Sequence, residues 1–184
     1  MEALKWRFRN NARLVEKIVT CIALGQKSKS DLHHLFNDMH KLSVIMNRLK
    51  RYNILSYDAC SRYSLTQYGR WLLICYTLGI RPVQLAILAL LYNNYHRSIA
   101  GNLGWIVPVI RREVERLSVE HRVYDGEYAW KQAKALCAIG WCRRYGRDGI
   151  ILEDATYEML KQWHDDIYAL YRHLRSADRY EVCV

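Results

Sequence analysis

The chain has 184 residues, 51% of them apolar, and its formal net charge is +10 at pH 7 with a pI near 9.4. This length suits one large domain or two small ones, and the apolar fraction is enough to build a buried core. The charge favours a polyanionic partner, and the excess of arginine over lysine, 19 to 9, suits phosphate and base recognition better than simple solubility. The N-terminal residues are charged throughout, which argues against a secretory signal peptide.

Three helices are expected in the first fifty residues. Apolar residues at helical spacing predict the first over Asn11–Leu24. A cap at its first residue opens a short second helix over Ser30–Phe36, and a third helix is expected over about residues 38–52. The inner face of the third helix carries Leu42, Ile45, Met46 and Leu49, and its outer face carries His40, Lys41, Ser43, Asn47, Arg48, Lys50 and Arg51.

The residues after the third helix predict a β-hairpin and a fourth helix. Ile54–Tyr57 and Arg62–Leu65 are short runs of strand formers that flank a polar tip. Thr66 follows directly and can cap the fourth helix through its hydroxyl group. The first half of the chain is therefore expected to hold three helices, a hairpin and a closing helix.

The stretch RYSLTQYGRWLL, residues 62–73, resembles the junction between wing and helix in winged helix-turn-helix regulators of archaea and bacteria. In that junction a leucine packs inward, a threonine caps the helix and a glycine allows close backbone packing; Leu65, Thr66 and Gly69 match these positions. The resemblance covers about residues 10–78. It implies that the third helix enters the major groove of DNA and that the hairpin, or wing, lies along the backbone or dips into the minor groove.

The resemblance also assigns candidate DNA contacts. Asparagine and arginine on the third helix can bridge the edges of adenine and guanine, whereas lysines and the remaining arginines suit phosphates. Residues 1–80 hold 13 Lys and Arg against 5 Asp and Glu, while residues 81–184 hold 15 against 13, so the first half is the more basic. The alternative is a basic face that only meets solvent. The candidates in this half are Lys41, Ser43, Asn47, Arg48, Lys50, Arg51, Arg62 and Tyr63, with Tyr57 beside the wing arginine.

The second half of the sequence follows the first at a shift of 87 residues. This shift places Ile54 on Trp141 and Leu65 on Leu152, and it predicts a second hairpin whose tip reads GRDG. Helices are expected over residues 82–95, 105–120 and 128–139 before that hairpin. The alternative is one winged domain followed by an unrelated helical domain. The candidate DNA contacts on the second wing are Arg143, Arg144 and Arg147.

The expected fold is therefore mainly α with two β-hairpin wings, as a tandem winged helix-turn-helix. The expected domains are residues 1–79, with a basic N-terminal arm, and residues 80–184. The apolar stretch Trp71–Tyr92 has the length of a membrane span, but Gly79, Arg81 and Pro82 interrupt it, so two buried helices are expected.

The C-terminal region predicts one long helix from about Asp154 to Leu174. Its apolar residues follow a heptad spacing that is typical of a helix seam. The seam either joins two copies in a homodimer, as winged-helix regulators often do, or packs on the core of its own domain. The seam residues are Leu160, Trp163, Ile167, Leu170 and Leu174.

Motifs for catalysis are missing from the sequence. It contains no P-loop, no G-x-G-x-x-G, no G-x-S-x-G and no H-E-x-x-H, so we expect neither an enzyme nor a bound cofactor. No C-x-x-C pair predicts a zinc site, and the His33-His34 pair with neighbouring Asp31, Asp38 and His40 is interpreted as a solvated polar face. The six cysteines are expected to be reduced thiols, although a disulfide is left open.

Three functions are compatible with the sequence. The leading expectation is a sequence-specific transcription regulator that binds double-stranded DNA as a homodimer or higher assembly, without a membrane. The alternatives are an architectural or packaging nucleoprotein that coats duplex DNA, and a winged-helix adaptor that binds protein. The expected location is intracellular, in the cytoplasm or nucleoid, or in a virion if the source is viral.

Overall fold

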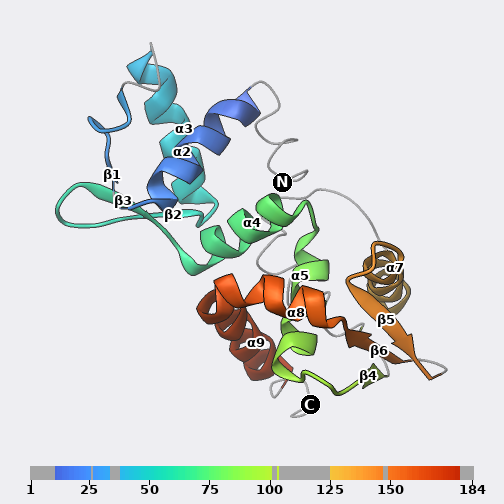
Figure 1. The fold of residues 1–184 in the computed structure, drawn as a ribbon. Helices are drawn as coiled ribbons and strands as arrows, with labels where there is room; N and C mark the ends of the chain where they lie inside the picture. Colours follow the sequence, from blue (N-terminus) through green and yellow to red (C-terminus); the bar gives the residue numbers. More distant parts are fainter. Residues whose placement is uncertain are drawn as a thin grey trace. The chain divides into compact units, whose positions relative to one another are not determined.

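The structure is a computed structural model of the chain, and it describes residues 11–25, 27–33, 38–100, 103, 125–146 and 149–178. Within these residues the fold is mainly helical with small antiparallel sheets, which confirms the expected class at that level (Figure 1). The chain divides into two compact units, with the described residues up to Gly79 in the first and those from Ile80 in the second.

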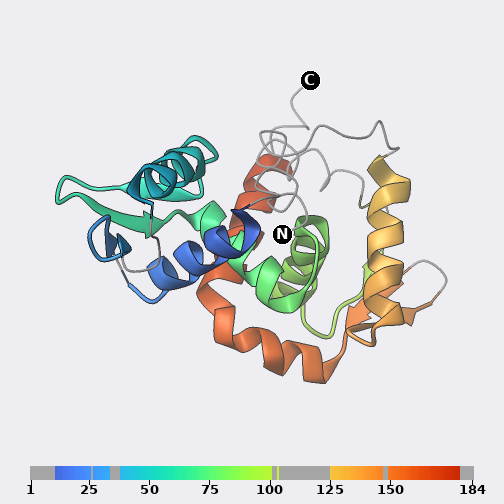
Figure 2. The same cartoon turned by 90° about the horizontal axis from the view of Figure 1, so that it is seen from above.

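The first unit contains three α-helices and three strands in its described residues. In chain order they are α2 (Ala12–Ala23), β1 (Lys27–Ser28), α3 (Met39–Arg51), β2 (Leu55–Tyr57), β3 (Arg62–Leu65) and α4 (Gln67–Leu78), of which α2, α3 and α4 are the helices described in full. The sheet has the order β1-β3-β2, and both pairings are antiparallel. In both ribbon views the tip of the hairpin β2–β3 extends beyond the helices of this unit (Figure 1, Figure 2).

The second helix, expected over Ser30–Phe36, falls only partly on the described residues. Ser30–Leu32 form a turn, His33 has 3-10 helical conformation, and residues 34–36 lie outside the described residues. The Asp31 carboxylate accepts a hydrogen bond from the Ser28 backbone N–H at 2.7 Å, and the Ser28 hydroxyl accepts one from the Asp31 N–H at 3.2 Å. These side chains therefore hold the turn after β1 instead of capping a helix over Ser30–Leu32.

Short-range signals explain where α3 and α4 begin. Asp38 accepts hydrogen bonds from the backbone N–H groups of His40 and Lys41, which caps α3. Thr66 accepts one from the Gly69 N–H at 2.9 Å, which caps α4 as expected. A Cβ atom on Gly69 would lie 2.2 Å from the backbone oxygen of Ile54, so only glycine allows this approach of α4 to the start of the hairpin.

The core of the first unit lies between α2, α3, α4 and the inner face of the sheet. Each helix contributes one apolar stripe at helical spacing, and β2 and β3 contribute leucines. All four residues expected on the inner face of α3 are at most 1% exposed. The largest buried side chains of this unit are Ile18, Leu32, Leu42, Ile45, Met46, Leu49, Ile54 and Ile74.

The second unit repeats this order with a longer C-terminal region. Its described elements are α5 (Pro82–Asn93), β4 (Ile99–Ala100), α7 (Asp125–Ala138), β5 (Cys142–Tyr145), β6 (Gly149–Leu152), α8 (Asp154–Leu160), the 3-10 helix η4 (Lys161–Trp163) and α9 (His164–Asp178). The sheet order is β4-β6-β5. The helix expected over residues 105–120 lies outside the described residues.

Backbone hydrogen bonds recur in the two units at the expected shift of 87 residues. The Ile54 N–H donates to the Leu49 oxygen, and the Trp141 N–H donates to the Leu136 oxygen, its counterpart at that shift. The same recurrence holds for the bond from residue 66 to residue 54 and for the bond from residue 70 to residue 66. The hairpin registers agree as well, because Leu55 pairs with Leu65 and Cys142 pairs with Leu152. From α3 to the start of α4, the second unit therefore has the same local backbone organisation as the first.

The apolar stretch Trp71–Tyr92 is divided into two helices, as expected. α4 ends at Leu78, Gly79 adopts a left-handed conformation, and α5 begins at Pro82. Every residue from Val83 to Tyr92 is buried, so α5 is the central helix of the second unit. Among the described residues, no single helix is long and apolar enough to cross a membrane, although α4 and α5 together pass that test as a bent pair.

The long C-terminal helix expected from Asp154 to Leu174 is not continuous. It breaks after Leu160 into the 3-10 turn η4, and α9 then begins at His164. Four of the five seam residues are at most 1% exposed, because α9 packs against α5 within the unit. Leu160, Ile167, Leu170 and Leu174 therefore pack in the core of their own unit, as the alternative interpretation of this stripe expects; Trp163 is half-buried.

Candidate nucleic-acid interface

The outer face of α3 is rich in exposed cations. Its apolar stripe is fixed in the core, so the residues between the buried positions must point outward. Arg48, Lys50 and Arg51 lie in the last turn, where positive charge also complements the helix dipole. Within the described part of the chain, none of the cations in this set forms an ion pair. The exposed candidates on α3 are Lys41, Asn47, Arg48, Lys50 and Arg51.

A chain of ring contacts joins the end of α3 to the hairpin. The ammonium nitrogen of Lys50 lies 4.8 Å from the centre of the Tyr57 ring. The Tyr57 ring in turn lies 4.7 Å from the Tyr63 ring, with 52° between their planes. This contact positions β2 and β3 beside the C-terminal half of α3, so one continuous surface carries the cations of both.

Tyr63 has a different role from the one expected. It is only 9% exposed, whereas Tyr57 is 46% exposed. Burial, followed by the neighbouring Tyr57, raises the pKa of the Tyr63 phenol. Tyr57 and Tyr63 are direct partners on β2 and β3, so their rings lie on the same face of the hairpin. Because Tyr63 is the more buried of the two, its ring supports the hairpin from the side of the core. The phenol available to a ligand is that of Tyr57.

Arg62 and Ser43 differ in how much they offer to a ligand. The Arg62 backbone N–H donates to the Asp58 carboxylate at 2.8 Å, and the Arg62 side chain is exposed at the start of β3. The Ser43 hydroxyl is half-buried and donates to the Met39 carbonyl oxygen at 2.9 Å. Ser43 therefore retains only its acceptor capacity for any ligand.

The edge strand β1 adds one cation, Lys27, that the sequence did not point to. Lys27 pairs with Tyr63 and Ser28 with Arg62, so a basic segment lies against the hairpin. The pKa of the nearby Asp31 carboxyl is lowered, first by its hydrogen bonds to Ser28 and then by the charges of Lys27 and Arg62. No local pattern predicts a two-residue strand, and only the pairing with β3 brings Lys27 to this surface.

The second hairpin is a weaker match to its expected role. The Arg143 guanidinium lies 3.4 Å from the Glu153 carboxylate, so part of its charge is neutralised. The Arg144 side chain is exposed and forms no hydrogen bond or ion pair with any described residue, while Arg147 lies outside the described residues.

A groove lies between α7 and the second hairpin. It has a volume of about 440 Å³, and no sequence pattern indicated it. Its described lining residues are Glu127, Trp130, Lys134, Cys137, Arg144, Gly149 and Ile150. At the shift of 87 residues they correspond to His40, Ser43, Asn47, Lys50, Tyr57, Arg62 and Tyr63, which is nearly the candidate surface of the first unit.

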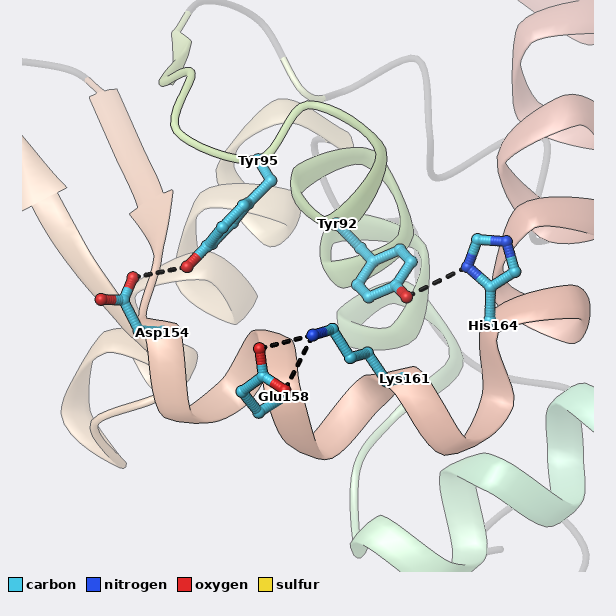
Figure 3. Close-up of polar contacts among 6 residues, drawn as sticks. All are labelled: Tyr92, Tyr95, Asp154, Glu158, Lys161 and His164. Carbon is cyan, nitrogen blue, oxygen red and sulfur yellow. Dashed lines mark hydrogen bonds and ion pairs between the residues drawn. The ribbon is translucent and has the colours of Figure 1, made fainter.

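An aromatic and polar cluster joins α5 to the C-terminal region of the second unit. Tyr95 donates to the Asp154 carboxylate at 2.7 Å, and the Tyr92 hydroxyl lies 3.1 Å from the His164 ring nitrogen Nδ1; both contacts are drawn in Figure 3. The Tyr157 ring stacks on that of Tyr95 at 3.8 Å. These contacts hold α8 and the start of α9 across the end of α5, so the cluster has a structural role at the helix break.

Thiol and metal chemistry find little support in the described residues. Burial raises the pKa values of Cys75 and Cys142 to about 12, so both stay protonated near neutral pH. The described cysteines are all free thiols, and no three described His, Cys, Asp or Glu side chains are grouped as metal ligands. His34 and Cys183 lie outside the described residues.

Comparison with protein-family models, with curated proteins and with solved structures finds no match to this chain.

Proposed function

We propose that the protein binds double-stranded DNA through the first unit, with α3 in the major groove and the hairpin β2–β3 along the backbone. One observation carries the proposal. Five exposed cations of this unit lie on α3 and the adjoining hairpin, and none forms an ion pair with another described residue; they are Lys41, Arg48, Lys50, Arg51 and Arg62. Exposed cations on a helix and a hairpin, without ion pairs to described residues, suit contacts with the phosphates of a duplex.

The order of elements supports the same proposal. Helix, edge strand, helix and hairpin with a β1-β3-β2 sheet are compatible with a winged helix-turn-helix, whose helix before the hairpin reads DNA. Asn47 and Arg48 lie on the exposed side of α3 and carry the amide and the guanidinium that can read base edges. On this basis the protein acts as a transcription regulator.

A binding titration tests the proposal. Fluorescence anisotropy of a labelled duplex is measured at several salt concentrations, with unlabelled random duplex as competitor. A regulator keeps a specificity ratio of roughly 10³ or more, whereas a protein that coats DNA does not. Absence of binding at low salt would contradict both and leave the protein-binding adaptor.

Matched variants distinguish the contributions of the two units to duplex binding. Arg48→Ala with Lys50→Ala removes two charges from the first unit, and Arg143→Ala with Arg144→Ala removes two from the second. We expect the first pair to weaken duplex binding more. The reverse order would show that the second hairpin, and not α3, dominates the interaction.

A further inference from the structure

The groove beside α7 is lined by residues whose equivalents in the first unit, at the shift of 87 residues, form a stack of side chains. Cys137, Arg144 and Ile150 line the groove at the positions that Lys50, Tyr57 and Tyr63 occupy in the first unit. There, two phenol rings and a lysine chain fill the space between helix and hairpin. Cysteine and isoleucine are smaller than lysine and tyrosine, so the same backbone arrangement leaves a groove of about 440 Å³ in the second unit.

One wall of the groove is an aromatic and cationic stripe on α7. Trp130, Lys134 and Cys137 are spaced by four and three residues, so they share one face of the helix. The Trp130 indole is half-exposed, and Lys134 is exposed. Neither side chain forms a hydrogen bond, ion pair or ring contact with another residue of the described ranges.

The opposite wall adds a second cation. Arg144 on β5 faces the groove together with Ile150 on β6, the residue it pairs with in the hairpin. Its guanidinium is not neutralised by a described acid, in contrast to Arg143 beside it, which meets Glu153. Lys134 and Arg144 therefore give the groove two positive charges from two different elements.

The acid in the groove does not cancel these charges. Glu127 forms an ion pair with Lys131 at 2.6 Å, one turn further along α7. The hydrogen bond from Lys131, followed by its charge and that of Lys134, lowers the pKa of the Glu127 carboxyl. Its oxygens still have acceptor capacity for an amine group of a ligand.

We propose that this groove binds one nucleotide unit, with the base stacked on Trp130 and the phosphate held by Lys134 and Arg144. A tryptophan face accepts any base, and two cations from different elements suit a phosphate. The volume falls within the range of ligand sites, about 300–1,000 Å³. The nucleotide unit has two sources, a free nucleotide or a nucleotide within a single strand, and the experiment below distinguishes them.

The role proposed for the groove is binding. Burial raises the pKa of the Cys137 thiol, so this thiol is protonated near neutral pH. The inference goes beyond duplex binding by the first unit and does not depend on it, because the two sites are in different units.

Three kinds of probe test the inference on the full chain. Anisotropy of a fluorescein-labelled oligothymidine strand measures binding of a single strand, and thymidine monophosphate as competitor measures binding of the free nucleotide. Thymidine and deoxyribose phosphate, each lacking one half of the nucleotide, should compete poorly. Competition by the monophosphate would identify a free-nucleotide site, and binding of the strand alone would identify a nucleotide within a strand; either supports the proposal.

Variants locate the binding in the groove. Trp130→Ala should weaken binding roughly five- to hundredfold, as expected for a lost stacking platform, whereas Trp130→Phe should retain much of it. Arg144→Ala should weaken binding at least as much as Lys134→Gln. Arg143→Ala is the matched control, because it removes the same charge from the neighbouring residue outside the groove.

The proposal is overturned if neither probe binds, or if Arg143→Ala and Arg144→Ala have equal effects. Circular dichroism confirms folding of each variant, and the two charge variants carry the test if Trp130→Ala does not fold. Lys50→Ala separates the two proposals, since it should reduce duplex binding and leave nucleotide binding unchanged.

Discussion

The Lys50 ammonium group lies over the Tyr57 ring, 4.8 Å from its centre, so the last turn of α3 and strand β2 form one surface. The contact leaves the lysine exposed and its charge unpaired within the described chain. A phosphate approaching α3 therefore meets a cation that is already positioned, with little side-chain freedom left to lose.

Lys50→Ala should weaken binding to all duplex sequences alike and reduce the slope of log K against log salt by about one. The reason is that a phosphate contact releases counterions but carries no sequence information. Anisotropy titrations on a specific and a random duplex measure both quantities. Lys17→Ala, an equal change of charge on the exposed side of α2, is the control. Equal effects of the two changes would mean that only the net charge of the protein matters.

Asn47→Ala should reduce the free-energy discrimination between bases at one base pair by about 1–3 kcal/mol. It should leave the slope of log K against log salt unchanged. The exposed amide has the donor and acceptor that adenine's edge requires, and its loss removes information without removing charge. Affinities for a panel of single-base duplex variants give the result. A uniform loss across the panel, with no position singled out, would favour a protein that coats DNA.

Gly69→Ala should destabilise the first unit by about 1–3 kcal/mol or more, since the new Cβ would meet the Ile54 oxygen at 2.2 Å.

Thr66→Ala should cost about 1–2 kcal/mol through loss of the helix cap. Urea unfolding followed by circular dichroism measures both free energies. Thr77→Ala, on the exposed side of the same helix, should have a small effect; a comparable loss there would show that the effect is not specific to the cap.

Local signals explain which elements were predictable from the sequence. Asp38 and Thr66 cap the helices that follow them through bonds to N–H groups within three residues, so their role is visible without any tertiary contact. The second hairpin follows from repetition at a shift of 87 residues, since the backbone register of Trp141 and Leu136 repeats that of Ile54 and Leu49.

Features that depend on packing were not predictable. β1 exists because Lys27 and Ser28 pair with β3, and two residues carry no periodicity of their own. The heptad spacing at Leu160 and Ile167 is equally compatible with a dimer seam and with an internal core, and packing against α5 selects the core. The groove at Trp130 likewise depends on which side chains face each other across the helix and the hairpin.

Leu49→Ala and Leu136→Ala should each lower the free energy of unfolding by about 2–5 kcal/mol. Both leucines are 0% exposed, and they stand at equivalent positions of α3 and α7. Thermal or urea unfolding gives the loss, and Leu24→Ala is the control, because Leu24 is 83% exposed and should change stability by less than about 0.5 kcal/mol. A negligible effect of Leu136→Ala alone would contradict the repeated core of the second unit.

The hydrogen bond between Tyr95 and Asp154 predicts a loss of stability at alkaline pH. The bond to the carboxylate raises the pKa of the Tyr95 phenol to about 12, above the ordinary value of 10. Folding therefore favours the neutral phenol, and this contribution to stability is fully present below about pH 10 and is lost as the pH rises from about 10 to about 12.

Urea unfolding midpoints of the wild type and of Tyr95→Phe, measured from about pH 9 to about pH 11.5, isolate this contribution. The difference between them should be constant at first and then shrink as the pH rises above about 10, because the wild type loses the bond that the variant never had. Tyr145→Phe is the matched control, since it removes a hydroxyl from an exposed tyrosine of the same unit. The difference between Tyr145→Phe and Tyr95→Phe should shrink above about pH 10 in the same way as the difference between wild type and Tyr95→Phe. A difference between wild type and Tyr95→Phe that stays constant over the whole range would show that Asp154 does not stabilise the phenol, and that ring stacking on Tyr157 alone holds α8 against the end of α5.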